Sequence, residues 1–281
     1  TSYFDDVDCG LEDEEEQEDT PIYSINEDKT EVTFGSYPQS LVTDDAVKTA
    51  LDSKIGLLPT STNNYDWTSY GYYISSSNDT NFMWYQDIIL DNYKYRAVYF
   101  TSFRPYSIDY SSSASSTFQD DNGYYTSTVY YFRFDPIIWK VLELDETNNK
   151  AFLFANIALD AQDYFYDSTL TRTIDGKTVY ANNYEYSTIR SWLNDNFYNT
   201  AFTKEEQQII LDTLVDNSAS STGYTKNQYA CNDTIDKIFL LSYSDVVNSK
   251  YGFISNISRQ LRSTDYAKAQ GCYKSTSTSY L

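Results

Sequence analysis

Short segments in which apolar and polar residues alternate dominate the first half of the chain, and this pattern predicts half-buried β-strands. The predicted strands are 30–34 (TEVTF), 93–100 (YKYRAVYF), 130–134 (YYFRF), 137–144 (IIWKVLEL) and 150–157 (KAFLFANI). Pro136 separates the third strand from the fourth, because proline cannot donate to a ladder of hydrogen bonds. The polar run 145–149 (DETNN) predicts a turn that pairs the last two strands.

Helical spacing begins only after these strands. Residues 187–198 are predicted as a helix, because their apolar side chains recur at intervals of three and four. The apolar positions are Ile189, Trp192, Leu193 and Phe197. Trp192 is therefore predicted to lie in the core, as is Trp139 in the run of β-forming residues upstream.

A capping box of Thr203 and Glu206 predicts the start of a second helix. Its expected apolar stripe consists of Ile209, Ile210 and Leu214. A buried strand is predicted over 237–241 (KIFLL), and a short helix over 242–251. Near the first strand, Gly35 and Pro38 predict a fixed turn with an unusual backbone angle.

Three polar stretches divide this pattern. Residues 60–82 predict a long loop or hairpin, and the serine-rich residues 107–122 predict a mobile surface insertion. Residues 5–19 contain ten acidic side chains and no basic one, so this arm repels itself. We therefore expect residues 1–28 to be an acidic disordered linker and residues 29–281 to form a single α+β domain.

Charge and composition exclude several classes of function. The 281 residues include 41 Asp and Glu against 20 Lys and Arg, which gives a net charge of −21. This balance disfavours nucleic acid and anionic lipid, which need cationic side chains. Histidine is absent, which removes histidine-dependent triads and histidine metal ligands. No run of 18 apolar residues predicts a transmembrane segment.

The location is predicted from the same composition. Thirty tyrosines, with abundant serine, threonine and asparagine, favour an extracellular or cell-surface protein. Cys231 and Cys272 are candidates for a disulfide in an oxidising compartment, and two reduced thiols are the alternative. The three cysteines of the chain cannot complete a tetrahedral zinc site alone.

An ordered set of short motifs resembles one bacterial family. The motifs are FGSYPQS (34–40), YRA (95–97), FDPIIWKVL (134–142), IRSWLN (189–194), AFTKE (201–205), TIDKIFLLS (234–242) and TDYAKA (264–269). Together they resemble the family called domain of unknown function 6273, over about Thr30 to Gly271. The resemblance implies a C-type-lectin-like α+β fold, similar to sulfatase-modifying proteins, with small mixed or antiparallel sheets, two or three flanking helices and long loops.

The same resemblance bears on location and on completeness. It implies a surface or secreted protein of anaerobic bacteria, and it transfers no catalytic residue. The chain lacks the Trp-Trp-Leu-Arg-Ser and Val-Arg-Pro-Ala segments expected near its end. Its C-terminal part is therefore expected to end differently or to be incomplete.

Candidate sites are few. Arg190 is predicted to pair with a carboxylate such as Asp236. Calcium is the one cofactor that the composition favours, because oxygen ligands suffice for it. The candidate ligands are Asp120, Asp121 and Asn122, with a solvated turn as the alternative. The EF-hand pattern fails there, because Tyr131 occupies the position of its bidentate glutamate.

Aromatic residues crowd the loop region between the first strands. The six rings are Trp67, Tyr70, Tyr72, Tyr73, Trp84 and Tyr85. Exposed rings of this kind stack on sugars and anchor protein partners, whereas buried rings would form a second small core. We expect a non-enzymatic binding module for a glycan or a protein. The alternatives are a carboxylate-dependent hydrolase and a structural subunit of a surface assembly, and the oligomeric state is left open.

Overall fold

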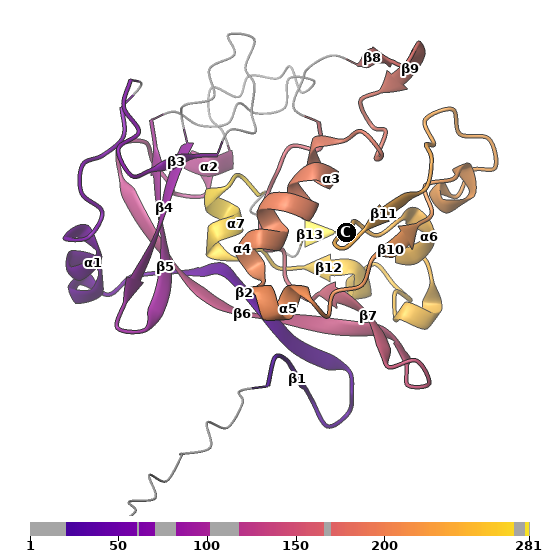
Figure 1. The fold of residues 1–281 in the computed structure, drawn as a ribbon, viewed down its shortest axis with the longest axis horizontal. Helices are drawn as coiled ribbons and strands as arrows, with labels where there is room; N and C mark the ends of the chain where they lie inside the picture. The colour runs from indigo at the N-terminus through magenta and orange to yellow at the C-terminus, as the bar shows by residue number, and fades with distance from the viewer. Residues whose placement is uncertain are drawn as a thin grey trace, which may run out of the picture.

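The computed structural model describes residues 21–60, 62–70, 83–101, 118–165, 170–272 and 279–280 (Figure 1). The main sheet contains β1 (Ser24–Ile25), β2 (Glu31–Leu41), β3 (Thr68–Ser69), β4 (Met83–Leu90), β5 (Tyr93–Phe100), β6 (Val129–Asp145) and β7 (Lys150–Ala155). Its order is β1-β2-β6-β5-β4-β3, and β7 pairs with the far end of β6. All of these pairs are antiparallel.

Three two-stranded ribbons and several short helices complete the described fold. The ribbons are β8 (Thr171–Ile174) with β9 (Lys177–Tyr180), β10 (Thr213–Val215) with β11 (Thr234–Asp236), and β12 (Gln260–Leu261) with β13 (Ser279–Tyr280). The α-helices are α1 (Asp45–Asp52), α2 (Phe118–Asp121), α3 (Thr188–Trp192), α4 (Tyr198–Ala201), α5 (Lys204–Gln207), α6 (Tyr243–Val246) and α7 (Asp265–Ala269). A π-helical turn, η1 (Leu193–Phe197), joins α3 to α4. The 3₁₀ turns are η2 (Ala219–Thr222), η3 (Ser249–Tyr251) and η4 (Ile257–Arg259).

Both faces of the main sheet are buried. Along β5, Tyr95 and Ala97 belong to one apolar core, and Val98 and Phe100 belong to the other, as the alternation of a strand requires. The first core is covered by α1, whose Leu51 is fully buried. The second core is covered by α3, η1, α4 and α7. In Figure 1, α1 lies at the left of the sheet, and the ribbon β10–β11 lies at the right of α3 and α4.

The long strand β6 corrects one prediction. The segments 130–134 and 137–144 form one continuous strand, in which Pro136 lies opposite Ser36 of β2. Register shifts in β2 on both sides of this pair accommodate the proline. Pro38 likewise lies inside β2, opposite Phe134, and not in a turn.

Gly35 has the unusual backbone angle that the sequence predicts, with a φ of +72°. A Cβ atom at this position would lie 2.6 Å from the ring of Phe202 and 2.8 Å from the carbonyl oxygen of Ala201. Glycine is therefore required twice here, by the backbone angle and by the close approach of the segment that follows α4.

The remaining predictions concern the strands, the first helices and the end of the N-terminal linker. The pairing of β6 with β7 across 145–149 and the predicted strand at 93–100 are confirmed. The expectation that helices appear only late is wrong, because α1 and α2 precede β6. Ser24 and Ile25, inside the predicted linker, pair with β2 because Asn26 closes the hairpin by accepting hydrogen bonds from the amides that follow it.

The region after α4 departs most from the prediction. The capping box of Thr203 and Glu206 is confirmed, but α5 ends at Gln207. The hydroxyl of Tyr198 donates to the carbonyl oxygen of Gln207 at 3.2 Å, which gives this helix end a tertiary partner. Leu214, predicted on a helical stripe, lies instead in β10. The predicted strand at 237–241 is also wrong, because the paired residues are those of β11, immediately upstream.

Candidate functional site

The predicted aromatic site is mostly core. Trp67, Tyr70 and Trp84 have exposed fractions of 2, 7 and 3%, so their rings offer no free face to a ligand. The indole N–H of Trp67 donates to the carbonyl oxygen of Leu57 at 3.1 Å. The alternative of a second core is therefore confirmed for Trp67 and Trp84, Tyr70 lies in the other core, and exposed rings are wrong at all three positions. Tyr72 and Tyr73 lie outside the described residues.

Tyr85, the remaining member of the group, covers a buried cation. The guanidinium of Arg96 lies 4.1 Å from the centre of the Tyr85 ring and binds both carboxylate oxygens of Asp87, at 2.8 and 3.0 Å. The hydroxyls of Tyr70 and Tyr266 lie 2.9 Å apart in the same network, and burial raises the pKa of both. These contacts assign the rings to the interior of the protein.

The predicted calcium ligands lie at the end of α2 and directly after it. Asp120 and Asp121 end α2, whereas the side-chain amide of Asn122 donates to the carbonyl oxygens of Lys268 and Cys272, at 3.0 and 2.8 Å. Asn122 thus fastens the end of α7 to α2. No group of three or more His, Cys, Asp or Glu side chains that could hold a metal occurs within the described ranges, and calcium binding stays a prediction.

The two candidate disulfide cysteines are free thiols. The amide of Cys231 donates to the carbonyl oxygen of Asn217, at the closed end of the ribbon β10–β11. Burial raises the pKa of its thiol. The sulfur of Cys272 lies 3.1 Å from the hydroxyl oxygen of Ser263, beyond α7. The reduced alternative is therefore the one that the structure contains.

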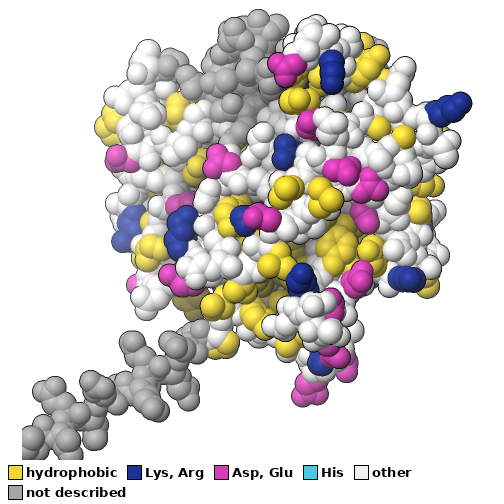
Figure 2. All heavy atoms as spheres, turned by 45° about the vertical axis from the view of Figure 1, so that its right-hand side comes forward, with side chains coloured by type: hydrophobic (Ala, Val, Ile, Leu, Met, Phe, Trp, Pro, Cys, Tyr) yellow, Lys and Arg dark blue, Asp and Glu magenta, His cyan; other side chains and the backbone are white. Residues whose placement is uncertain are grey.

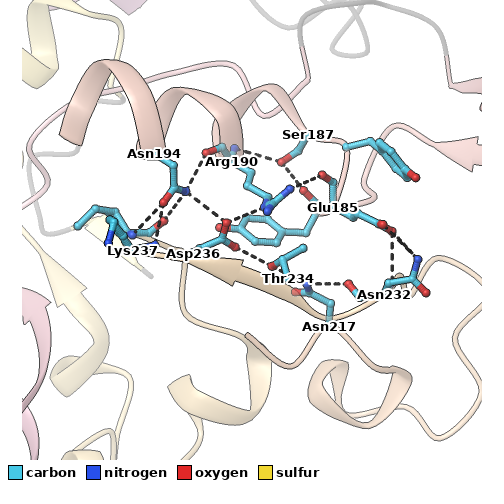
Figure 3. A network of polar contacts seen from close by, with 12 residues as sticks. Glu185, Ser187, Arg190, Asn194, Asn217, Asn232, Thr234, Asp236 and Lys237 are labelled. Carbon is cyan, nitrogen blue, oxygen red and sulfur yellow. Dashed lines mark hydrogen bonds and ion pairs between the residues drawn. The ribbon is translucent and has the colours of Figure 1, made fainter. Parts of the chain in front are cut away.

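The predicted pair of Arg190 and Asp236 is confirmed, and it lies at the centre of a polar network (Figure 3). The Nε atom of Arg190 donates to Oδ1 of Asp236 at 2.8 Å. The Asp236 side chain is only 2% exposed, and its Oδ2 accepts a hydrogen bond of 2.6 Å from the hydroxyl of Thr234. A carboxylate this deeply buried needs such partners, because its desolvation is costly.

Asn194, in the first turn of η1, joins the network to the residues after β11. Its side-chain oxygen accepts from the amides of Lys237 and Ile238, at 2.9 and 3.2 Å, and its side-chain nitrogen donates to the carbonyl oxygen of Ile238. One amide side chain thus provides the backbone pairing that a neighbouring strand would otherwise provide. Lys237 and Ile238 therefore have a side-chain partner in place of a neighbouring strand.

Side-chain hydrogen bonds also fix the end of the ribbon at which a loop connects β10 to β11. The side chain of Glu185 accepts from the amide and the side chain of Asn232, at distances between 3.1 and 3.3 Å. Asn217 donates to the hydroxyl of Thr234 at 3.1 Å. Figure 3 shows these side chains between α3 and the ribbon, so the network fastens β10 and β11 to the helix.

The consequence is a ribbon with reversed polarity. Thr234 and Asp236 point inward and are buried, whereas Ile235 between them is 66% exposed. Its partner across the ribbon is Leu214, which is 69% exposed. Antiparallel strands with one solvated face normally place polar residues outside and apolar residues inside. We call the outward surface of Leu214 and Ile235 the ribbon face.

Figure 2 turns this side of the molecule toward the viewer. Hydrophobic side chains are grouped in the middle of the view, with acidic side chains beside them. Sequence reasoning missed the ribbon face, because it placed Leu214 on a helix and did not place Ile235 on a strand. The available signal was the shared start of DTLVD (212–216) and DTIDK (233–237), in which one aliphatic residue follows Asp-Thr, although Val215 breaks the strict alternation in the first segment.

The described residues define an α+β protein, with an antiparallel sheet, short helices and a surface ribbon of reversed polarity. No helix in these ranges has the length and apolar character needed to cross a membrane. Residues 148–279 match the model of the family described as Domain of unknown function (DUF6273). The match confirms the predicted family resemblance over that range, which contains α3, the network and the ribbon but not β1 to β6. Neither the curated proteins nor the solved structures yielded a match.

Proposed function

We propose that this chain is a non-enzymatic binding module, secreted or displayed on a bacterial cell surface, that recognises a protein through the ribbon face. A lectin-like relationship of the scaffold is part of this proposal. The ribbon face takes the role that the sequence suggested for the aromatic loop, because the rings of Trp67, Tyr70 and Trp84 are buried.

The observation that carries the proposal is the reversed polarity of the ribbon. Burial of a leucine or isoleucine side chain is worth roughly 1.5–3 kcal/mol, so exposure of Leu214 and Ile235 forgoes this stabilisation. A shift of β10 by one residue would turn Leu214 inward, and a shift of β11 would turn Ile235 inward. The ion pair of Arg190 with the buried Asp236 opposes this shift. We interpret this pair of adjacent aliphatic side chains, held outward beside a buried ion pair, as an interaction surface.

A glycan is the second candidate ligand, and two exposed rings favour it. Tyr224 is 70% exposed and Tyr243 is 57% exposed. Gly223, the residue before Tyr224, lies against Tyr243, because a Cβ atom at this glycine would lie 2.6 Å from the Tyr243 ring. Flat exposed rings suit stacking on sugar faces. A carboxylate-dependent hydrolase stays a further alternative, to which no residue pair is assigned.

The test compares matched variants on two arrays. Wild type, Leu214→Ser/Ile235→Ser and Tyr224→Ala/Tyr243→Ala are applied to an array of bacterial surface proteins and to a glycan array. The control is Ile254→Ser/Ile257→Ser, because these isoleucines are 77 and 78% exposed but lie in the segment before and at the start of η4. Binding to a protein that falls about tenfold or more in the ribbon variant, and not in the control, supports the proposal.

Two results would contradict it. Protein binding that is equal in the ribbon variant and the control would remove the ribbon face from the function. Glycan binding that is lost only in Tyr224→Ala/Tyr243→Ala would assign recognition to the ring pair and to sugars.

A further inference from the structure

The outward surface of the ribbon carries three successive pairs of side chains. Residues two apart on a strand share a face, and the register pairs Leu214 with Ile235 in the centre. At one end, Asp212 and Lys237 form an ion pair of 2.9 Å, which shows that they lie opposite each other on this same side. At the other end, Asp216 and Asp233 adjoin the last pair, Val215 with Thr234, so the register continued by one residue would place them opposite each other, and both are exposed.

The two ends differ in charge. Lys237 neutralises Asp212, whereas neither Asp216 nor Asp233 takes part in an ion pair among the described residues. Like charges directly opposite each other destabilise a ribbon. The turn backbone holds them there, because Asp216 accepts from the amide of Ser218 at 2.8 Å and Asp233 accepts from the amide of Asn217 at 3.0 Å.

Asp216 and Asp233 are acidic side chains exposed to solvent. The hydrogen bonds from Ser218 lower the pKa of Asp216. The hydrogen bonds described above engage one oxygen of each carboxylate, Oδ1. The ribbon therefore presents an apolar centre with an uncompensated double negative charge at one end only.

We propose that the ribbon face binds a protein surface in which apolar side chains cover Leu214 and Ile235 while a lysine or arginine contacts Asp216 and Asp233. This inference rests on the proposed function and specifies the chemistry of the partner. A second copy of the chain fits less well, because it would bring to this acidic end the Asp212–Lys237 pair, whose net charge is zero. The net charge of −21 on each copy adds repulsion.

The probe is a phage-displayed library of random peptides, selected on immobilised wild type and depleted on Leu214→Ser/Ile235→Ser. The expected survivors combine apolar residues with a lysine or arginine. Their affinity should fall about tenfold in Asp216→Asn/Asp233→Asn. It should change less than about twofold in Asp66→Asn/Asp91→Asn, which removes the same charge from exposed positions beside the main sheet. Raising the salt from about 0.05 to about 0.5 M should weaken the wild-type interaction and affect Asp216→Asn/Asp233→Asn less.

The outcomes separate this inference from the function on which it rests. Ribbon-dependent peptides without basic residues, bound equally by Asp216→Asn/Asp233→Asn, would overturn the charged contact and leave the ribbon face as a binding site. Failure to enrich any ribbon-dependent peptide would count against both. A wild type that sediments as a dimer, with Leu214→Ser/Ile235→Ser as a monomer, would make the partner a second copy and overturn the inference.

Discussion

Two arginine–aspartate pairs, one in the main sheet and one beside the ribbon, are built in opposite ways. In the sheet, the Arg96 side chain is 5% exposed and that of Asp87 is 28% exposed. Beside the ribbon, Arg190 is 28% exposed and Asp236 is 2% exposed. The buried member is thus the cation in the first pair and the carboxylate in the second.

The difference follows from what surrounds each pair. Arg96 lies among rings, with Tyr85, Phe134 and Tyr266 centred 4.1, 5.6 and 5.9 Å from its guanidinium carbon, and it leaves the apolar core on that face intact. Asp236 occupies an inward position that a strand normally gives to an apolar residue, so Ile235 points to solvent. An arginine–aspartate pair thus lies beside buried apolar side chains in the sheet and beside an exposed isoleucine in the ribbon.

The largest expected effect is in the sheet. We expect Arg96→Met to lower the free energy of unfolding by about 3 to 5 kcal/mol, because it leaves Asp87 without its two strongest hydrogen bonds and removes the cation from the rings. Urea denaturation measures the loss. The control is Lys94→Met, since Lys94 contacts the same carboxylate at 3.5 Å but is 40% exposed and should cost below about 1 kcal/mol. Equal losses would mean that burial of Arg96 is not what matters.

Beside the ribbon, the corresponding change should have a smaller and more local effect. We expect Arg190→Met to cost about 3 kcal/mol, at the lower end of the range given for Arg96→Met, because Asp236 is left only 2% exposed but keeps its hydrogen bond from Thr234. Hydrogen exchange should show lost protection in β10 and β11 before the main sheet is affected. Unchanged protection of these strands would show that the ion pair does not hold the ribbon in register, and the comparison between the two regions would fail.

The sheet region was partly predictable from sequence, because β5, β6 and β7 are rich in β-forming residues, whereas β4 was not predicted as a strand. The strand at 93–100 was predicted with its observed ends, and Trp139 is buried, with its indole N–H donating to the carbonyl oxygen of Phe34 at 2.7 Å. Pro136 misled the prediction, because the register shifts that accommodate it belong to the opposite strand. The sequence around a proline does not show whether a strand distant in the chain changes its register to accommodate that proline.

The candidate site was only half predictable. The pairing of Arg190 with Asp236 was anticipated from the residue types, and the structure confirms it. The ribbon that this pair supports was missed, because a three-residue strand with polar residues inside opposes the rule by which strands are recognised. Prediction of a strand from alternating apolar and polar residues fails most readily where the apolar residue faces solvent.

Lowering the pH should destabilise the protein through the Arg96–Asp87 pair of the main sheet. Burial raises the pKa of Asp87, but Arg96 and then Lys94 outweigh it, so its pKa is lowered overall. A carboxyl group with a folded pKa below its unfolded value of about 3.9 adds stability above that pH and loses it as the pH falls further. We therefore expect stability to fall between about pH 5 and about pH 2, by less than Arg96→Met costs, and less steeply in Asp87→Asn. If wild type and Asp87→Asn lost stability identically with falling pH, protonation of Asp87 would not contribute to the loss.

The smallest effect is expected on the ribbon face itself, and it bears most directly on the proposed function. Leu214→Thr/Ile235→Thr should change the free energy of unfolding by no more than about 0.5 kcal/mol, since both side chains are exposed in the native state and threonine suits a strand. Ile137→Thr, at a fully buried position of β6, should cost about 2 kcal/mol or more. Thermal or urea unfolding of the two variants gives the comparison. A ribbon variant that loses as much as Ile137→Thr would mean that these side chains stabilise the fold. A loss of binding with unchanged stability would mean that they are kept outside for a partner.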